Sequence, residues 1–143
     1  PIMALSSRSE SVARTTRSQL QSLGIDLPRS LTPKTNFFLA DAPGVWFIDG
    51  ILFTSGRDKG EMLMFFLQEI KYTPRRIVFI DDKKSCLESV ERKVGKILQF
   101  VGLRYNRSDP IVSAFDPAVA EVELEHLQNR LLSDDSAGRI DQS

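Results

Sequence analysis

The stretch that decides the fold is PRRIVFIDDKKSCLESV, residues 74–90. Pro74 breaks the preceding segment, and an uninterrupted apolar run follows from Ile77 to Ile80. Such a run between helical segments predicts a central parallel strand that is buried on both faces. Asp81 and Asp82 end this strand, and apolar side chains at helical spacing predict a helix over residues 85–94.

Helical and extended patterns alternate on both sides of this stretch. Residues 59–70 carry a broad apolar stripe at helical spacing, which predicts a helix, and residues 97–103 predict a further strand. Two apolar runs, 45–48 and 51–54, flank Asp49-Gly50, which is the pattern of a β-hairpin with a two-residue turn. Residues 36–39 predict a short strand in the proline-containing segment before this hairpin.

The two ends of the chain complete the pattern. Residues 2–5 are apolar and predict a buried strand, and Ser9 or Ser11 is placed to cap a helix over residues 10–23. Asp116-Pro117 begins a last helix, because aspartate caps helices and proline is tolerated in the first turn. Because the chain enters a core strand directly after Pro1, we expect a preceding segment, with the first strand of the sheet, to be missing from it.

The alternation predicts an α/β fold with a Rossmann-like, mainly parallel sheet, flanking helices and a small β-hairpin insertion. A chain of 143 residues accommodates one domain with a substantial core. We place this domain at residues 1–132, with residues 25–56 as the loop and hairpin insertion. Residues 133–143 are polar and predict a flexible tail.

Charge and composition exclude some classes of partner. Nineteen basic residues balance nineteen acidic ones, which gives no global electrostatic reason for binding nucleic acid or an anionic membrane. No apolar run is long enough to span a bilayer. The single cysteine, Cys86, excludes an internal disulfide and leaves open whether the protein is soluble in the cytoplasm or exported with its leader removed.

Polar and charged residues gather where the predicted strands end, which is where α/β sheets place their ligand sites. The first strand ends in Ser6, the hairpin leads to Lys59 at a helix start, and the deciding stretch ends in Asp81 and Asp82. Paired carboxylates supply the hard oxygen ligands that Mg²⁺ prefers. A hydroxyl and a lysine are suited to binding phosphate oxygens and offsetting their charge, so the set indicates a phosphoryl-transfer site.

Each residue also has a purely structural interpretation. Ser6 or Ser7 caps the following helix in that case, Lys59 lies in solvent, and Asp82 is the N-cap of the next helix. The adjacent carboxylates are the hardest to explain in this way, because they repel one another and a cap needs only one.

The order hydroxyl, lysine, acidic pair resembles that of the haloacid-dehalogenase-like (HAD) superfamily, whereas response-regulator receivers have their acidic pair first. IMALSSR, residues 2–8, resembles the motif that ends in Ser or Thr. TSGRDKGEML, residues 54–63, resembles the lysine motif, and IVFIDDKKSCLESV, residues 77–90, resembles the acidic motif. These segments together with FVGLRYNRSD, residues 100–109, resemble the bacterial family DUF2608 over about residues 2–132.

The resemblance implies a Mg²⁺-dependent phosphohydrolase that acts on a phosphorylated small molecule through an aspartyl-phosphate. It gives Ser6 and Lys59 supporting catalytic roles and makes Asp81 and Asp82 the metal ligands. Ser7, Arg8 and Arg57 are the residues expected to bind substrate phosphate.

One part of the HAD pattern is missing. The nucleophile belongs to an Asp-x-Asp motif, and this chain contains none; Asp49 lies out of order and is interpreted as a turn residue. We therefore expect the chain to be inactive by itself, as the C-terminal two-thirds of such an enzyme. The alternative is a non-catalytic binding or assembly module, in which the exposed sheet edges lead to homo-oligomers or strand exchange.

Overall fold

A computed structural model describes residues 1–27, 36–126 and Arg139 of the chain. These residues belong to two units, residues 1–105 and residues 106–143. Most of the predicted tail, residues 133–143, lies outside the described residues, as does part of the predicted insertion.

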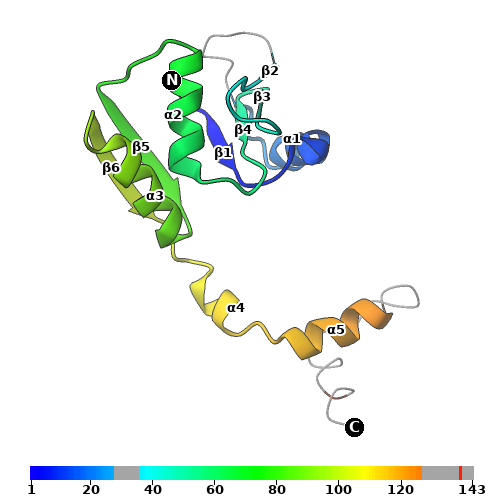
Figure 1. Ribbon diagram of the computed structural model, residues 1–143. Coiled ribbons are helices and arrows are strands. Elements are labelled where there is room, and N and C mark those ends of the chain that lie inside the picture. The colour runs from blue at the N-terminus through cyan, green and yellow to red at the C-terminus, as the bar shows by residue number, and fades with distance from the viewer. Residues whose placement is uncertain (28–35, 127–138, 140–143) are drawn as a thin grey trace. The chain divides into compact units, whose positions relative to one another are not determined.

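The larger unit contains a four-stranded mixed sheet with the order β1-β4-β3-β2. β1 (Ala4–Ser6) pairs in parallel with β4 (Ile51–Phe53), and β4 pairs antiparallel with β3 (Trp46–Ile48). β2 (Phe37–Phe38) completes the sheet beside β3, and Figure 1 shows these short strands together. The prediction of a small hairpin inserted in an α/β fold is confirmed.

The hairpin turn has the backbone that its sequence predicts. Asp49 has φ 48° and Gly50 has φ 83°, so both central residues are left-handed. A two-residue turn of this kind matches the right-handed twist of its strands, and Asp-Gly adopts it at little cost. Ile48 and Ile51 are directly paired across the turn.

The deciding stretch forms the second sheet, a parallel pair of β5 (Arg76–Asp81) and β6 (Gln99–Arg104). The connection between them is α3 (Lys84–Val94), which buries Val90 and Val94. This β5-α3-β6 unit is the parallel strand–helix–strand element that the alternating pattern predicts (Figure 1).

The prediction that residues 77–80 are buried on both faces is wrong. Burial alternates along β5: Ile77 and Phe79 pack against the core, whereas Val78 and Ile80 are 57% and 63% exposed. Within residues 1–105 as described, no element covers the second face of the β5–β6 pair. A continuous apolar run therefore marks a strand with two apolar faces, of which only one is covered in this unit.

The helices begin close to where their sequence patterns predict. α1 (Ala13–Ser22) follows a short 3-10 turn, η1 (Glu10–Val12). Ser9 stands at the N-cap of that turn, yet its side chain makes no capping hydrogen bond. α2 (Lys59–Glu69) is capped by Asp58, whose carboxylate accepts a hydrogen bond from the backbone N–H of Glu61.

Helix α2 contributes more buried apolar side chains to the core than any other described element. It buries Met62, Leu63, Phe66 and Leu67, and the ring of Phe66 lies 4.8 Å, centre to centre, from that of Phe47. Partly buried side chains of both sheets pack against this same cluster, namely Met3, Leu5, Ile77 and Phe79. The two sheets of the larger unit therefore share one core through α2.

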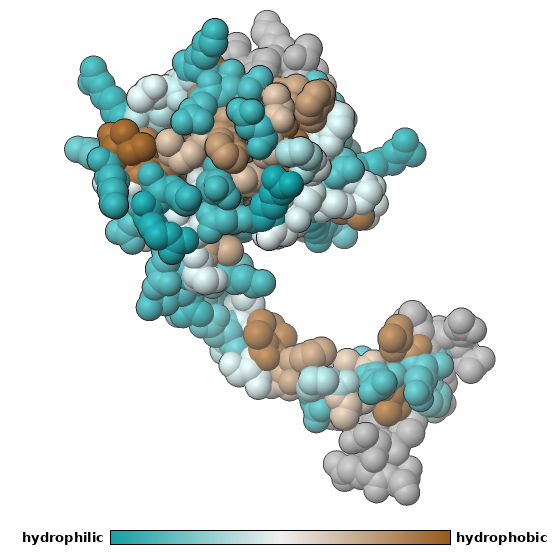
Figure 2. Space-filling view, in the orientation of Figure 1, coloured by the Kyte–Doolittle hydropathy of each residue, from teal (hydrophilic) through white to brown (hydrophobic). Residues whose placement is uncertain are grey.

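The smaller unit contains α4 (Asp109–Ser113) and α5 (Pro117–His126). The Asp116 carboxylate accepts a hydrogen bond from the backbone of Ala118, so it caps the helix as predicted. Ile111, Val112 and Phe115 are exposed, and Figure 2 shows brown, apolar surface along this unit. None of the described helices has the length and apolarity that crossing a membrane requires.

Candidate functional site

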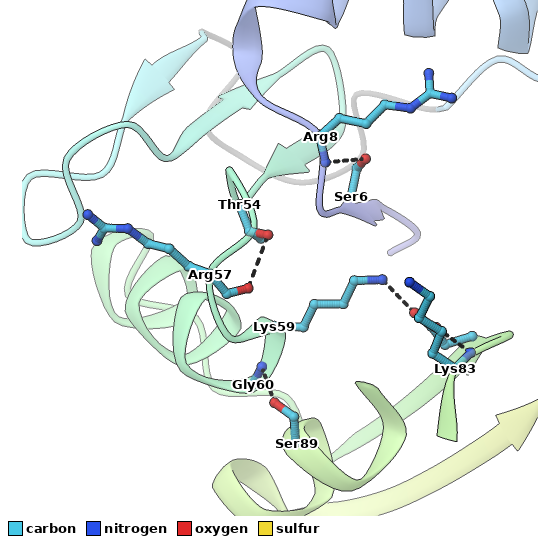
Figure 3. A network of polar contacts seen from close by, with 9 residues as sticks. Ser6, Arg8, Thr54, Arg57, Lys59, Gly60, Lys83 and Ser89 are labelled. Carbon is cyan, nitrogen blue, oxygen red and sulfur yellow. Dashed lines mark hydrogen bonds and ion pairs between the residues drawn. The ribbon is translucent and has the colours of Figure 1, made fainter. Parts of the chain in front are cut away.

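Two of the predicted site residues meet at the carboxyl ends of the strands. Lys59, the first residue of α2, places its Nζ atom 2.6 Å from Oδ2 of Asp81, the last residue of β5. Both side chains are largely shielded from solvent: that of Lys59 is 12% exposed and that of Asp81 is 6% exposed. Figure 3 shows the lysine reaching across from α2 to the end of β5.

The N-cap of α2 fixes the position of Lys59, which is the first residue of that helix. Asp58 Oδ1 accepts from the N–H of Glu61 at 2.8 Å, and Asp58 Oδ2 lies 3.4 Å from Arg92 of α3. Burial raises the pKa of Asp58, but the Glu61 hydrogen bond and further contacts with Ser89, Arg92 and Lys93 together hold it below its ordinary value. The sequence Asp58-x-x-Glu61 is a capping signal that identifies this helix start.

Gly60 brings α2 and α3 unusually close together. Its N–H donates to Ser89 Oγ at 3.0 Å, and a Cβ atom added at Gly60 would lie only 2.3 Å from the Ser89 carbonyl oxygen (Figure 3). No side chain fits in that space. The close approach of α3 to the residue beside Lys59 sets the position of the lysine relative to β5.

Asp81 is held at both carboxylate oxygens. Oδ1 accepts a hydrogen bond of 2.9 Å from the backbone N–H of Lys83, and Oδ2 accepts from Lys59. Burial raises the pKa of Asp81, but the hydrogen bonds from Lys59 and Lys83 and the charge of Lys59 outweigh it, so the pKa lies below its ordinary value. The carboxylate is therefore held in its charged form.

Asp82 has a different position from its neighbour. It follows the strand, is exposed, and its backbone carbonyl accepts from Arg104 Nε at 3.2 Å. The N-cap residue of α3 is Lys83, so the interpretation of Asp82 as that N-cap is wrong. The Lys83 N–H donates to Asp81, which is buried, whereas Asp82 lies exposed beside it.

The loops after β1 and β4 are joined by backbone hydrogen bonds. Carbonyl groups of Ser6, Arg8 and Ser7 accept from the N–H groups of Thr54, Ser55 and Gly56, respectively. This pairing places the end of β1 beside the loop that leads to Lys59. It also engages these three N–H groups, which leaves them unavailable to a phosphate.

Ser6 and Ser7 are near the strand end but are not helix caps of α1. Ser6 Oγ accepts from the N–H of Arg8 at 3.2 Å, within its own loop (Figure 3). Ser7 is exposed. The N-cap position of α1 is occupied by Val12, so the interpretation of these serines as caps of that helix is wrong.

The two predicted arginines extend away from Lys59. Arg8 Nη1 donates to Thr16 Oγ1 at 3.0 Å and Gln19 Oε1 at 2.7 Å, both in α1. The backbone carbonyl of Arg57 accepts from Thr54 Oγ1, and its guanidinium points away from Lys59 in Figure 3. The structure thus brings Lys59 and Asp81 together and leaves these arginines apart from the pair.

Three other residues border the site without having been selected from the sequence. Gly60 and Ser89 fix the α2–α3 approach, and the half-buried Cys86 borders the Lys59–Asp81 pair on α3. Burial raises the pKa of the Cys86 thiol, and Asp81 raises it further against the opposing charge of Lys59. An isolated glycine in a helical pattern is a weak sequence signal for Gly60. No pattern marks Ser89.

The oxygen donors at this site are of the kind that a hard divalent cation prefers, but they are too few to hold one by themselves. Asp81 is a charged, buried carboxylate beside Asp82, which is the chemistry Mg²⁺ prefers. Residues 1–27, 36–126 and 139 contain no group of three or more His, Cys, Asp or Glu side chains placed to hold a metal. A cation bound at Asp81 therefore requires further oxygen ligands from water, substrate or another segment.

Comparisons with known proteins identify relatives without a known activity. The sequence profile of a family described as "Protein of unknown function (DUF2608)" matches residues 1–138. The "Uncharacterized protein RP296" of Rickettsia prowazekii (strain Madrid E) is 27% identical over 126 residues, which cover 85% of this chain and 46% of the relative. The chain thus spans less than half the length of this curated relative. No solved structure matches.

Proposed function

This chain belongs to the DUF2608 family, whose function is not known, and we propose that it forms part of a Mg²⁺-dependent, HAD-like phosphohydrolase. The substrate is a phosphorylated small molecule. The contact between Lys59 Nζ and Asp81 Oδ2, 2.6 Å across the ends of two strands, is the observation that carries the proposal. A buried lysine beside a buried, charged aspartate is costly as a purely structural device.

Lys59 is proposed to bind a phosphate oxygen and to offset charge during phosphoryl transfer. In the structure Lys59 contacts Asp81 directly. With a phosphate and a cation bound, Lys59 would contact the phosphate and Asp81 would contact the cation instead. Ser6, at the end of β1, is proposed to donate a hydrogen bond from its hydroxyl to a phosphate oxygen. A Mg²⁺ ion held by Asp81 and Asp82 would neutralise phosphate charge.

The remaining predicted residues have proposed roles at the edge of the site. Ser7, exposed on the loop after β1, is available to a phosphate or to the rest of the substrate. Arg8 must give up its contacts with Thr16 and Gln19 before it can bind an anion. Arg57 must change rotamer, because its guanidinium extends away from Lys59.

In the proposed reaction these 143 residues do not supply the nucleophile. The sequence contains no Asp-x-Asp, and each oxygen of the buried Asp81 is already engaged. We therefore propose that the chain alone binds phosphate and Mg²⁺ weakly and does not hydrolyse phosphomonoesters.

Titration of the ¹⁵N-labelled chain with orthophosphate and Mg²⁺, followed by NMR, tests this proposal. We expect amide shifts at Ser6, Lys59 and Asp82 in the wild-type chain and a loss of those shifts in Lys59→Met. The Arg76→Met variant, which changes an exposed cation at the opposite end of β5, is the matched control. Shifts that persist unchanged in Lys59→Met, or a dissociation constant weaker than about 10 mM, contradict it.

A non-catalytic binding or assembly module is the second candidate, and two observations favour it. Lys59 and Asp81 are paired directly with one another, with opposite charges. β1 and β5 are also not paired with each other, which leaves strand edges that can join a second copy by oligomerisation or strand exchange. Phosphate binding without turnover in a protein that carries the missing segment would favour this candidate.

A further inference from the structure

Two lysines follow the acidic pair at the end of β5, and their side chains differ in what they contact. Lys84 Nζ lies 3.2 Å from Glu88 Oε1, one turn along α3. Lys83 is the N-cap residue of α3 and is exposed. Within residues 1–27, 36–126 and 139, no carboxylate forms an ion pair with its ammonium group. The charge of Lys84 is therefore offset on the helix surface, whereas that of Lys83 is not.

The backbone of Lys83 ties this residue to the candidate site. Its N–H donates to Oδ1 of Asp81 at 2.9 Å, while Lys59 Nζ donates to Oδ2 of the same carboxylate. Lys59 thus reaches Asp81 through its side chain from α2, and Lys83 reaches it through its backbone from the start of α3. The hydrogen bond at the Lys83 N–H fixes the point from which its side chain extends.

The Lys83 side chain extends toward the space in which the Lys59 ammonium group lies. In Figure 3 the side chains of Lys59 and Lys83 point toward one another. The thiol of Cys86 is affected by both charges, because burial raises its pKa while the positive charges of Lys59 and Lys83 act in the opposite direction. Two cations therefore face the end of β5, one from each helix.

The two ammonium groups lie at different depths. The side chain of Lys59 is 12% exposed and is paired with Asp81. Lys83 is exposed, so its ammonium group lies at the surface of the same site. A ligand that places one anionic group on Lys59 therefore brings the next part of the molecule past Lys83.

The arginines predicted to bind substrate are placed less well for this contact. Arg8 is hydrogen-bonded to side chains of α1, and the Arg57 guanidinium points away from Lys59. Binding through either arginine requires contacts to be broken or a rotamer to change. Lys83 has no ion pair within the described residues to give up, so its charge is available to a ligand.

We propose that Lys83 binds a second anionic group of the substrate, which is then a small phosphate ester with a further negative charge beside the ester. The inference rests on the proposed function, in which Lys59 binds the phosphate group. An ammonium group at the surface of the site favours a ligand that carries a charge at that position over one that does not. Lys83 is therefore a specificity-determining residue, whereas Lys84 is a solvated residue of α3.

Two ligands that differ in one charge test this inference. Glycerol 3-phosphate and 3-phosphoglycerate share a three-carbon chain with a phosphate ester, and the second has a carboxylate where the first has an alcohol. We titrate the ¹⁵N-labelled chain with each ligand at one fixed Mg²⁺ concentration and follow the amides by NMR. Both should shift the amide of Lys59. We expect 3-phosphoglycerate to bind about three to five times more tightly, which is the contribution of an exposed ion pair.

Two variants assign the preference to one side chain. Lys83→Met removes the proposed contact but keeps the backbone N–H that Asp81 accepts, so the end of β5 keeps its structure. We expect this variant to bind the two ligands equally. Lys84→Met is the matched control, because it removes the same charge from the adjacent residue, where it is paired with Glu88. It should keep the preference of the wild type.

The outcomes separate this inference from the proposed function. Equal affinity of the wild type for the two ligands, or a preference that survives in Lys83→Met, overturns the role of Lys83 and leaves the phosphate site in place. Loss of the preference in Lys84→Met to the same extent would show a general attraction to the positive charge of α3, and it also overturns that role. Failure of both ligands to shift Lys59 overturns the proposed function and this inference together.

Discussion

Two side chains, Lys59 and Asp81, are central to the proposed function, and their contact is nearly excluded from water. Removal of one member of such a pair leaves the other charged and desolvated. We predict that Lys59→Met lowers the free energy of unfolding by roughly 3 kcal/mol. Urea denaturation measures this, and Lys59→Arg, which keeps the charge, should lose clearly less. Equal stability of the methionine variant and the wild type would show that the pair is unimportant for folding.

The pKa of Asp81 also makes stability depend on pH. The folded pKa lies below the ordinary value of 3.8, so this carboxylate stabilises the fold fully at pH well above 3.8. That contribution is lost as the pH falls below 3.8 and through the lower folded pKa. We predict a smaller fall in unfolding free energy between neutral pH and pH 3 for Asp81→Asn than for the wild type, measured by urea denaturation at each pH. Identical pH profiles would contradict the lowered pKa.

At the scale of single residues, the strand-end rule selected Lys59 and Asp81 from the sequence because both lie where an element begins or ends. The rule did not show which of Asp81 and Asp82 faces inward. That depends on the register of the strand, and register cannot be read from a single sequence. Gly60 and Ser89 were not predicted from the sequence, and the reason is a different one. Their importance comes from how closely two helices approach, and that distance is a property of packing.

At the scale of elements, the start of α2 depends on the contact between Gly60 and α3. An added Cβ atom 2.3 Å from the Ser89 carbonyl oxygen forces the helices apart. We predict that Gly60→Ala lowers the free energy of unfolding by about 1–3 kcal/mol, although alanine favours helices. Gln68→Ala, at an exposed site on the same helix, is the control for urea denaturation. A more stable Gly60→Ala variant would contradict the close approach.

The cap of α2 is a second element-scale determinant. Asp58 accepts the Glu61 N–H at 2.8 Å, and loss of such a cap costs about 1 kcal/mol. We predict this loss for Asp58→Ala by thermal or urea unfolding. Asp58→Asn keeps an acceptor oxygen and should retain most of the stability, so equal losses in both variants would point to the Arg92 contact instead.

Elements whose backbone conformation depends mainly on their own residues formed as the sequence predicts. The Asp49-Gly50 hairpin formed as predicted because both residues tolerate left-handed backbone. The burial of β5 was not predicted correctly. An apolar run shows which faces of a strand can be buried, but it does not show whether another element lies against each face. Val78 and Ile80 remain exposed for this reason.

At the scale of the whole molecule, the larger unit has one core but two sheets. α2 packs against both of them, and a groove between β1 and β5 interrupts hydrogen bonding where an α/β sheet is normally continuous.

The measurement that tests this account most directly is hydrolysis of p-nitrophenyl phosphate with Mg²⁺ by three samples: the chain alone, the unmatched part of RP296 alone, and their mixture. We predict turnover only in the mixture, abolished when the chain carries Lys59→Met. Hydrolysis by the chain alone would contradict the view that its nucleophile lies elsewhere. A mixture in which the two polypeptides bind one another, yet nothing is hydrolysed, would contradict the phosphohydrolase and favour the binding and assembly module.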